Sequence, residues 1–170
     1  MHPLPEATPG RLREPRNRVS PRAVWFWAVR ALAAWAVAVA LEVLIFIVGE
    51  HDIPAWHYVV VIVTAAIALT HITVMPQWRY RVHRWELTDQ AAYTQAGWFT
   101  QERRIAPVSR IQTVDLHRGP LEQLFRLANV TITTASAAGP LKIHALDRTA
   151  AETVIEQLTA RVQAVGGDAT

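Results

Sequence analysis

The sequence predicts an α+β protein: a two-helix transmembrane hairpin followed by a bent antiparallel sheet or open barrel, capped by a C-terminal helix. Two observations carry this prediction. Two long apolar runs occupy the first half of the chain. The second half consists of short segments in which apolar and polar residues alternate, followed by one amphipathic stretch. A chain of 170 residues leaves room for about one small domain beside the hairpin.

The apolar runs cover residues 25–48 and 56–75, within a hairpin of residues 22–77. Each run is about as long as a helix needs to cross a hydrocarbon core of roughly 30 Å. Two buried helices of a soluble bundle are the alternative, but the remaining residues are too few to cover them. Aromatic residues near the run ends are typical of the belts at membrane interfaces. They are Trp25, Trp27, Trp56, Tyr58, Trp78 and Tyr80.

The basic residues predict the orientation of the hairpin. Arginines precede the first run and follow the second, whereas the connector, residues 49–55, has no Lys or Arg. The positive-inside rule therefore places both termini in the cytoplasm and the connector outside. A cleaved signal peptide is the rival interpretation of the first run, but that run is longer than a signal core. The flanking arginines are Arg11, Arg13, Arg16, Arg18, Arg22, Arg79, Arg81 and Arg84.

The N-terminal tail, residues 1–21, is rich in Pro and Arg and poor in apolar residues, which predicts disorder. Its expected role is electrostatic attachment to the inner leaflet. The formal net charge of +3 is concentrated beside the membrane, so anionic lipid headgroups explain it better than nucleic acid does. Residues 167–170 form a short C-terminal tail.

Polar residues inside the runs are candidates for intramembrane contacts. Glu42 and His71 lie at different depths of an antiparallel hairpin, so a proton relay between them is not expected. We expect His71 to hydrogen-bond a neighbouring helix and Arg30 to extend its guanidinium to the inner interface. The sharper hypothesis is that Glu42 marks a contact with a transmembrane segment of a partner.

Residues 79–166 predict one cytoplasmic domain. A helical turn is expected at residues 121–125, after the Gly119-Pro120 corner. Asp147 is a suitable N-cap for a final amphipathic helix that ends at Gly166-Gly167. The strands are expected at residues 81–88, 91–95, 98–105, 109–118, 127–135 and 141–146.

Five sequence segments resemble the motifs of a known protein family. They are Trp85-Glu86-Leu87-Thr88, residues 104–114, Gly119-Pro120-Leu121-Glu122, Phe125-Arg126-Leu127-Ala128 and residues 134–139. Together with the spans they cover residues 23–165, and the sequence resembles the bacterial pleckstrin-homology-like family found next to membrane hairpins, the YdbS type. The resemblance implies a pleckstrin-homology-like fold on a two-helix anchor in the bacterial cytoplasmic membrane, without an established catalytic activity. The family usually has a small residue where Arg126 stands here.

Within the domain, most motif residues have structural explanations, and four polar residues remain as candidates. They form either a brace for the loops or an interaction or lipid surface, and they are Arg103, Arg104, Arg110 and Gln112. Arg103 and Arg104 suggest the inositol-phosphate pocket of eukaryotic pleckstrin-homology domains. That interpretation is disfavoured, because the loop at residues 97–99 is apolar rather than rich in lysine.

The sequence offers no pattern for catalysis, for a metal or for another cofactor. His51, Asp52 and His57 cluster in the connector, but the polarity of a water-facing loop explains them better than zinc does. The remaining His and Ser residues have no triad or ligand spacing, and no glycine-rich loop suggests nucleotide binding. We therefore expect a protein that is not an enzyme.

Two functions remain. The first is a membrane-anchored module that mediates protein–protein assembly as a homo-oligomer or as a complex with a larger protein of the same family. Its cellular role would be envelope maintenance or stress resistance. The alternative is an anionic-lipid-sensing or lipid-handling module.

Overall fold

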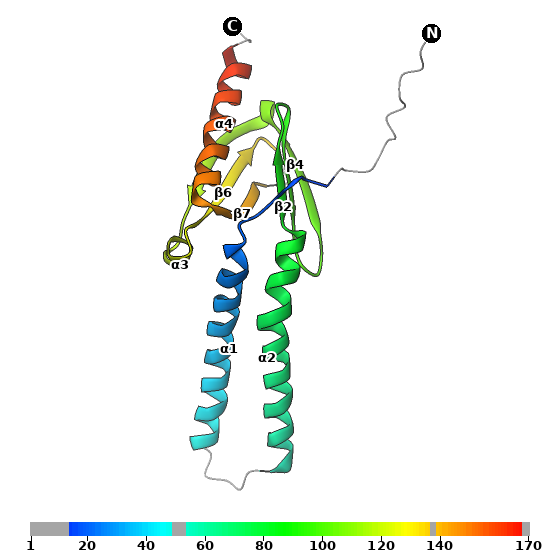
Figure 1. Ribbon diagram of the computed structural model, residues 1–170, viewed down its shortest axis with the longest axis vertical. Helices are drawn as coiled ribbons and strands as arrows, with labels where there is room; N and C mark the ends of the chain where they lie inside the picture. The colour runs from blue at the N-terminus through cyan, green and yellow to red at the C-terminus, as the bar shows by residue number, and fades with distance from the viewer. Residues whose placement is uncertain (1–13, 49–53, 137–138, 168–170) are drawn as a thin grey trace, which may run out of the picture.

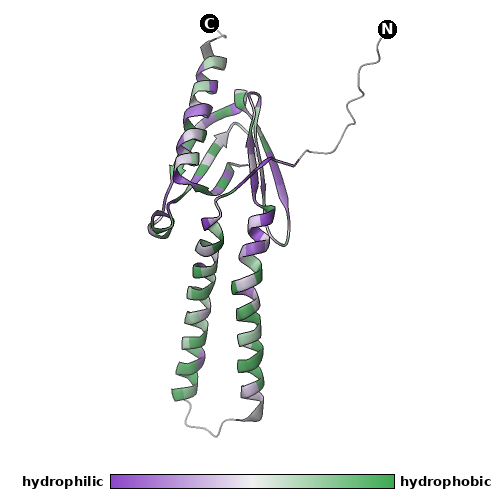
Figure 2. Ribbon diagram, viewed as in Figure 1, coloured by the Kyte–Doolittle hydropathy of each residue, from purple (hydrophilic) through white to green (hydrophobic). Residues whose placement is uncertain are grey.

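Two long helices extend from one end of a small module of strands and helices (Figure 1). The structure is a computed structural model, and it describes residues 14–48, 54–136 and 139–167. Helices α1 (Arg22–Val48) and α2 (Ala55–Val82) pack side by side and are apolar along most of their length (Figure 2). Only 6% and 0% of their most apolar windows are buried, in contrast to the core helices of soluble proteins. Both are long and apolar enough to cross a membrane.

The module contains two antiparallel sheets that do not close into one barrel. The first has the order β1-β2-β3-β4, and the second has the order β5-β6-β7. The strands of the first sheet are β1 (Asn17–Arg18), β2 (Arg84–Leu87), β3 (Ala91–Ala96) and β4 (Glu102–Pro107). The strands of the second sheet are β5 (Ile111–His117), β6 (Leu127–Thr134) and β7 (Leu141–Asp147).

Three helical segments complete the module. The 3₁₀ turn Val108–Arg110 joins the sheets, α3 (Pro120–Leu124) joins β5 to β6, and α4 (Arg148–Gly167) follows β7. Gly119-Pro120 starts α3, because proline is favoured in the first helical turn. The predicted α+β fold, with two long apolar helices, open antiparallel sheets and a C-terminal helix, is thereby confirmed.

The main core lies between the two sheets and α4. The apolar stripe of α4 contributes Ala151, Val154 and Leu158, each at most 2% exposed. They pack against the inward side chains of the strands, such as Val130 and Ile132, which are fully buried. Burial of each aliphatic side chain of this size contributes about 1.5–3 kcal/mol, so α4 is part of the core.

A second core joins the hairpin to the module. Phe26 and Trp27 of α1 are buried with Leu127 of β6 and Ala145 of β7. The Phe26 ring lies 6.1 Å from that of Phe125, in an edge-to-face arrangement. Trp27 was expected in the interfacial aromatic belt, and this is wrong because its ring is 3% exposed and covered by the module. The hairpin therefore has a fixed attachment to the module.

The N-terminal tail is also partly folded. The prediction of disorder to residue 21 is wrong for residues 17–20, because β1 pairs with β2, and Val19 and Ser20 are at most 4% exposed. Sheet pairing and burial of Val19 outweigh the weak local preference of this segment. For residues 1–13, the prediction lies outside the described residues.

Three strands begin later than the sequence suggested, and one of them is β5, which was expected from residue 109 and begins at Ile111 after the 3₁₀ turn. The first predicted strand begins at Arg84, because α2 continues to Val82. The third begins at Glu102 instead of residue 98. Gly97 has a φ of +118°, which starts a turn that occupies residues 98–101. Pro107 ends that strand as predicted.

Candidate functional site

Arg103 and Arg104 are neighbours on β4, so their side chains lie on opposite faces of the sheet. Arg103 is in one cross-strand row with Gln95 and Arg84. Glu14 lies between the two arginines, with its carboxylate 3.3 Å from Arg103 Nη2 and 3.8 Å from Arg84 Nη1. On this face, an ion-pair network ties the tail to β2 and β4.

Arg104 points into a polar cleft between the two sheets. Its Nη1 donates to the carbonyl oxygen of Pro140 at 2.7 Å, and its Nε lies 3.3 Å from Glu102. The cleft has a volume of about 310 Å³ and is also lined by Lys142 and His144 of β7. Arg104 thus connects β4 to the start of β7, where the barrel stays open.

The electrostatics of this cleft are less cationic than its residues suggest. Burial, and then the positive charge of Arg79, lower the pKa of His144 below its usual value. His144 is therefore neutral near pH 7. Glu102 balances Arg104, so Lys142 carries the remaining positive charge. This arrangement gives weak attraction for an anionic headgroup, which disfavours the cleft as a lipid site.

The other two candidates lie elsewhere. Arg110 is exposed in the 3₁₀ turn, and its carbonyl oxygen accepts a bond from the N–H of Ala135. Gln112 is exposed at a register shift of β5, between Ile111 and Thr113. The structure therefore does not join the four predicted residues into one patch. Arg103 and Arg104 hold segments together, and Arg110 and Gln112 are surface residues at the start of β5.

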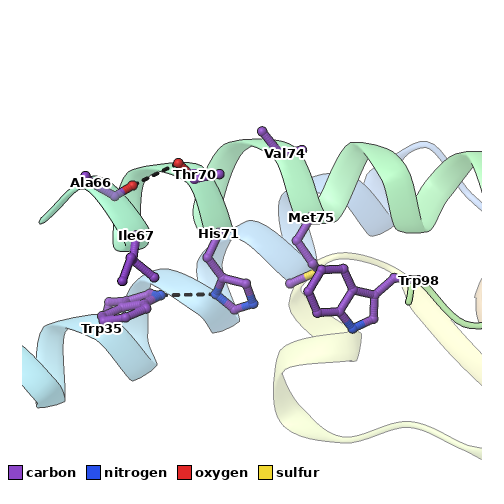
Figure 3. A pocket seen from close by; sticks show the side chains of 8 residues that line it. All are labelled: Trp35, Ala66, Ile67, Thr70, His71, Val74, Met75 and Trp98. Carbon is purple, nitrogen blue, oxygen red and sulfur yellow. Dashed lines mark hydrogen bonds between the residues drawn. The ribbon is translucent and has the colours of Figure 1, made fainter. Parts of the chain in front are cut away.

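A hydrogen bond links the two apolar helices. Trp35 Nε1 donates to His71 Nδ1 at 3.1 Å (Figure 3). This is the contact with a neighbouring helix that the sequence predicted for His71. Since Nδ1 accepts, a neutral His71 carries its proton on Nε2. Arg30, on α1, has its guanidinium 5.5 Å from the ring centroid of Phe26.

An apolar groove lies beside this pair. It has a volume of about 530 Å³ and lies between α2 and the β3–β4 loop, residues 97–101. Trp98 of the loop closes one end, next to Met75 (Figure 3), with its ring 6.2 Å from that of His71. Trp78 Nε1 donates to the carbonyl oxygen of Trp98 at 2.8 Å. The loop is thereby fixed against the apolar part of α2.

Glu42 is half-buried on α1 and is not brought to His71. The partner of His71 is Trp35, which lies about 10 Å along the helix from Glu42. No hydrogen bond or ion pair of Glu42 is found within residues 14–48, 54–136 and 139–167. The candidate metal cluster of the connector includes His51 and Asp52, which lie outside the described residues. Among the described residues, no group of three His, Cys, Asp or Glu is arranged to hold a metal.

Sequence reasoning missed three contributors to these sites: Glu14, Trp35 and Trp98. The sequence contained a signal for Trp35, because its indole N–H donor lies at a depth near that of His71 in an antiparallel hairpin. No comparable signal existed for Glu14 and Trp98. Their roles arise from the pairing of β1 and from the turn at Gly97.

Comparisons with known proteins agree with this architecture. The sequence profile of the bacterial PH domain matches residues 28–162. The transmembrane protein YdbS of Bacillus subtilis (strain 168) is 28% identical over 127 residues, which is 72% of this chain and 79% of that relative. No solved structure gives a significant match. The matched region includes most of α1, all of α2 and the module from β2 to the last turns of α4, but not β1.

Proposed function

The chain belongs to the bacterial PH domain family, and from this premise we propose that it is a non-enzymatic, membrane-anchored assembly module. It acts at the inner face of the bacterial cytoplasmic membrane. Its partner is a second copy or a larger membrane protein of the same family, in envelope maintenance or stress resistance. The observation that carries this proposal is the exposed edge of β4.

The proposed location follows from contacts at the base of the hairpin. The N–H of Ser20, before α1, donates to the carbonyl oxygen of Ala145, after α2, at 3.0 Å. This contact between the two ends of the hairpin supports the proposal that both ends lie on one side of the membrane. Arginines flank the spans on this side, which supports the cytoplasmic assignment.

The edge of β4 supports assembly through strand addition. β4 pairs with β3 on one side, and within the described part of the chain no strand pairs with its other side. Four of its six residues are exposed, and Ile105 is 43% exposed. An unpaired edge strand with an exposed apolar residue is a template for a strand of another chain. β5 also has an edge, and α4 contacts this strand together with β6 and β7.

The hairpin offers a second contact. Glu42 is half-buried within a helix whose apolar neighbours are exposed. A carboxyl group at this depth is costly unless another helix supplies a hydrogen-bond partner. A transmembrane segment of the partner would meet this need.

The test is purification of the full-length protein in mild detergent, with the mass of the complex and its components determined. Assembly predicts a dimer or a heterocomplex, and a lone monomer would contradict it. Ile105→Lys places a charge on the β4 edge and is expected to reduce the assembled fraction. Leu116→Lys adds the same charge on β5, where Leu116 is 39% exposed, and is the matched control.

Glu42→Gln tests the intramembrane contact separately, since it keeps the volume of the side chain. We expect weaker co-purification of the partner. Unchanged co-purification in both Ile105→Lys and Glu42→Gln would refute both proposed contacts. A complex that dissociates when anionic lipid is removed would instead favour the lipid-sensing alternative.

A further inference from the structure

Four arginines surround a cavity at the end of the module that meets α1. The cavity has a volume of about 790 Å³, within the range of ligand sites. Its charged lining consists of Arg22, Arg118, Arg126, Arg148 and Asp147. Four arginines and one aspartate thus line the cavity, so its charged lining is mainly cationic. It is separate from the cleft that contains Arg104, and the assembly proposal does not use it.

Two of the arginines have carboxylate partners. Arg22 Nη1 donates to Asp147 Oδ1 at 3.3 Å, and the hydroxyl of Ser20 donates to the same oxygen at 2.9 Å. Arg148 Nε donates to Glu152 at 2.8 Å. These bonds fix both arginines at the rim and offset part of their charge.

The other two arginines supply the excess charge. Arg118 Nε donates to the carbonyl oxygen of Leu127 at 3.2 Å. This bond to a backbone atom fixes the orientation of the guanidinium group, including its two terminal nitrogens. For Arg126, no side-chain hydrogen bond or ion pair is found within the part of the chain that the structure describes, and the residue is exposed. Such groups bind phosphate oxygens well, because guanidinium donors match their geometry.

Arg126 also has an unusual backbone. Its φ of +55° is a conformation that glycine adopts freely and that other residues rarely adopt. The turn after α3 therefore carries a long cationic side chain at a position where glycine would be less strained. A substitution of Arg126 by glycine can therefore remove the charged side chain without destabilising the turn.

The cavity lies at the level expected for lipid headgroups. Arg22 is the first residue of α1, three residues before the predicted span. Phe125, which follows α3, contacts Phe26 of α1. Figure 1 shows α3 and the start of α4 at the end of the module from which the hairpin extends. On α3, Leu124 is 75% exposed, as an apolar residue at a membrane surface would be.

From this arrangement we infer that the four-arginine cavity binds the phosphate of an anionic phospholipid headgroup of the inner leaflet. Arg118 and Arg126 contact the phosphate oxygens, and Arg22 and Arg148 form the rim. Exposed Leu124 enters the adjoining acyl region. The ligand is a lipid rather than a free phosphate because the cavity opens beside the first turn of a transmembrane helix.

The test uses full-length protein in neutral detergent, with bound lipids counted by native mass spectrometry after addition of phosphatidylglycerol. Phosphatidylcholine is the zwitterionic comparison. We expect selective retention of phosphatidylglycerol. In Arg126→Gly, we expect about tenfold weaker retention, the factor that corresponds to 1.4 kcal/mol. Thermal stability of this variant should be unchanged or higher, because glycine relieves the backbone strain.

Arg110→Gln is the matched control. It removes the same charge at the opposite end of β5, about 26 Å from Arg118 at the usual strand spacing, and should leave retention unchanged. Equal losses in Arg126→Gly and Arg110→Gln would overturn the site, as would equal retention of both lipids. If excess inorganic phosphate displaced phosphatidylglycerol from the native protein but not from Arg126→Gly, the proposal that the ligand is a lipid would be wrong. Arg118→Gln provides a second variant with the same expected loss.

Discussion

His83 Nδ1 lies 2.8 Å from the carbonyl oxygen of Arg79, one turn earlier at the end of α2. Arg79 Nε donates to His83 Nε2 at 3.5 Å. Nδ1 must then donate and Nε2 accept, which is the neutral tautomer. The Trp27 ring, centred 5.1 Å away, covers the imidazole. Burial, and then the charge of Arg79, lower the pKa of His83 to about 4.

The protein should lose stability in mild acid. Because the folded-state pKa of His83 is about 4 and its ordinary value is 6.5, only the unfolded chain takes up this proton between these values. The free energy of unfolding is therefore expected to fall as pH decreases from 6.5 to 4, by about 1–3 kcal/mol. Thermal unfolding in detergent across this range measures the effect.

His83→Gln should reduce this pH dependence. The half-buried His144, whose pKa is also lowered, contributes in the same direction and will leave part of the slope. His117, an exposed histidine, gives the control variant His117→Gln. If the free energy of unfolding of His83→Gln fell with decreasing pH as steeply as that of the native protein, the role assigned to His83 would be wrong.

Trp35→Phe should weaken the hairpin. The variant removes the donor to His71 Nδ1 within the apolar helices, and such bonds contribute about 0.6–2 kcal/mol in membranes. Thermal unfolding of the purified protein measures the loss. Trp25→Phe is the control, since Trp25 is 70% exposed. Equal melting temperatures of Trp35→Phe and Trp25→Phe would show that the hydrogen bond does not contribute to stability.

Gly97→Ala should destabilise the β3–β4 loop. A Cβ at this position would lie 1.9 Å from the carbonyl oxygen of Thr100, and the φ of +118° is strained for alanine. Gly139→Ala separates the two effects, because its φ is +77° but no atom lies within 4 Å of the added Cβ. We expect about 1 kcal/mol for Gly139→Ala and a larger loss for Gly97→Ala. Chemical denaturation of both variants tests this order.

Phe99 should lie in the membrane. It is 90% exposed at the tip of the loop that Trp98 holds against Met75 and His71, which belong to the proposed span. The chain has no cysteine, so Phe99→Cys and Gln112→Cys can be labelled singly with an environment-sensitive dye. In vesicles, we expect blue-shifted emission and quenching by spin-labelled lipids at position 99, and emission typical of water at position 112. Similar spectra would place the loop outside the bilayer.

Much of the fold could be predicted because its signals are local. The apolar runs, the alternation in β6 and the stripe of α4 each specify an element without reference to distant residues. The β1 segment could not be predicted, because Val19 is buried only when β2 and β7 are in place. The same reason applies to the site. Arg103 and Arg104 were predicted as one patch, but alternation along β4 directs them to different neighbours, Glu14 and Pro140.

The contact between Ser20 and Asp147 also determines the order of events during synthesis. The two residues are 127 positions apart, which takes the ribosome roughly 6–25 s at 5–20 residues per second. During this interval Ser20 lacks its partner Asp147, while both apolar helices and the strands up to β7 leave the ribosome. The strand β1 can pair with β2 earlier, but the contact between Ser20 and Asp147 forms among the last, and it closes the chain around the base of the hairpin.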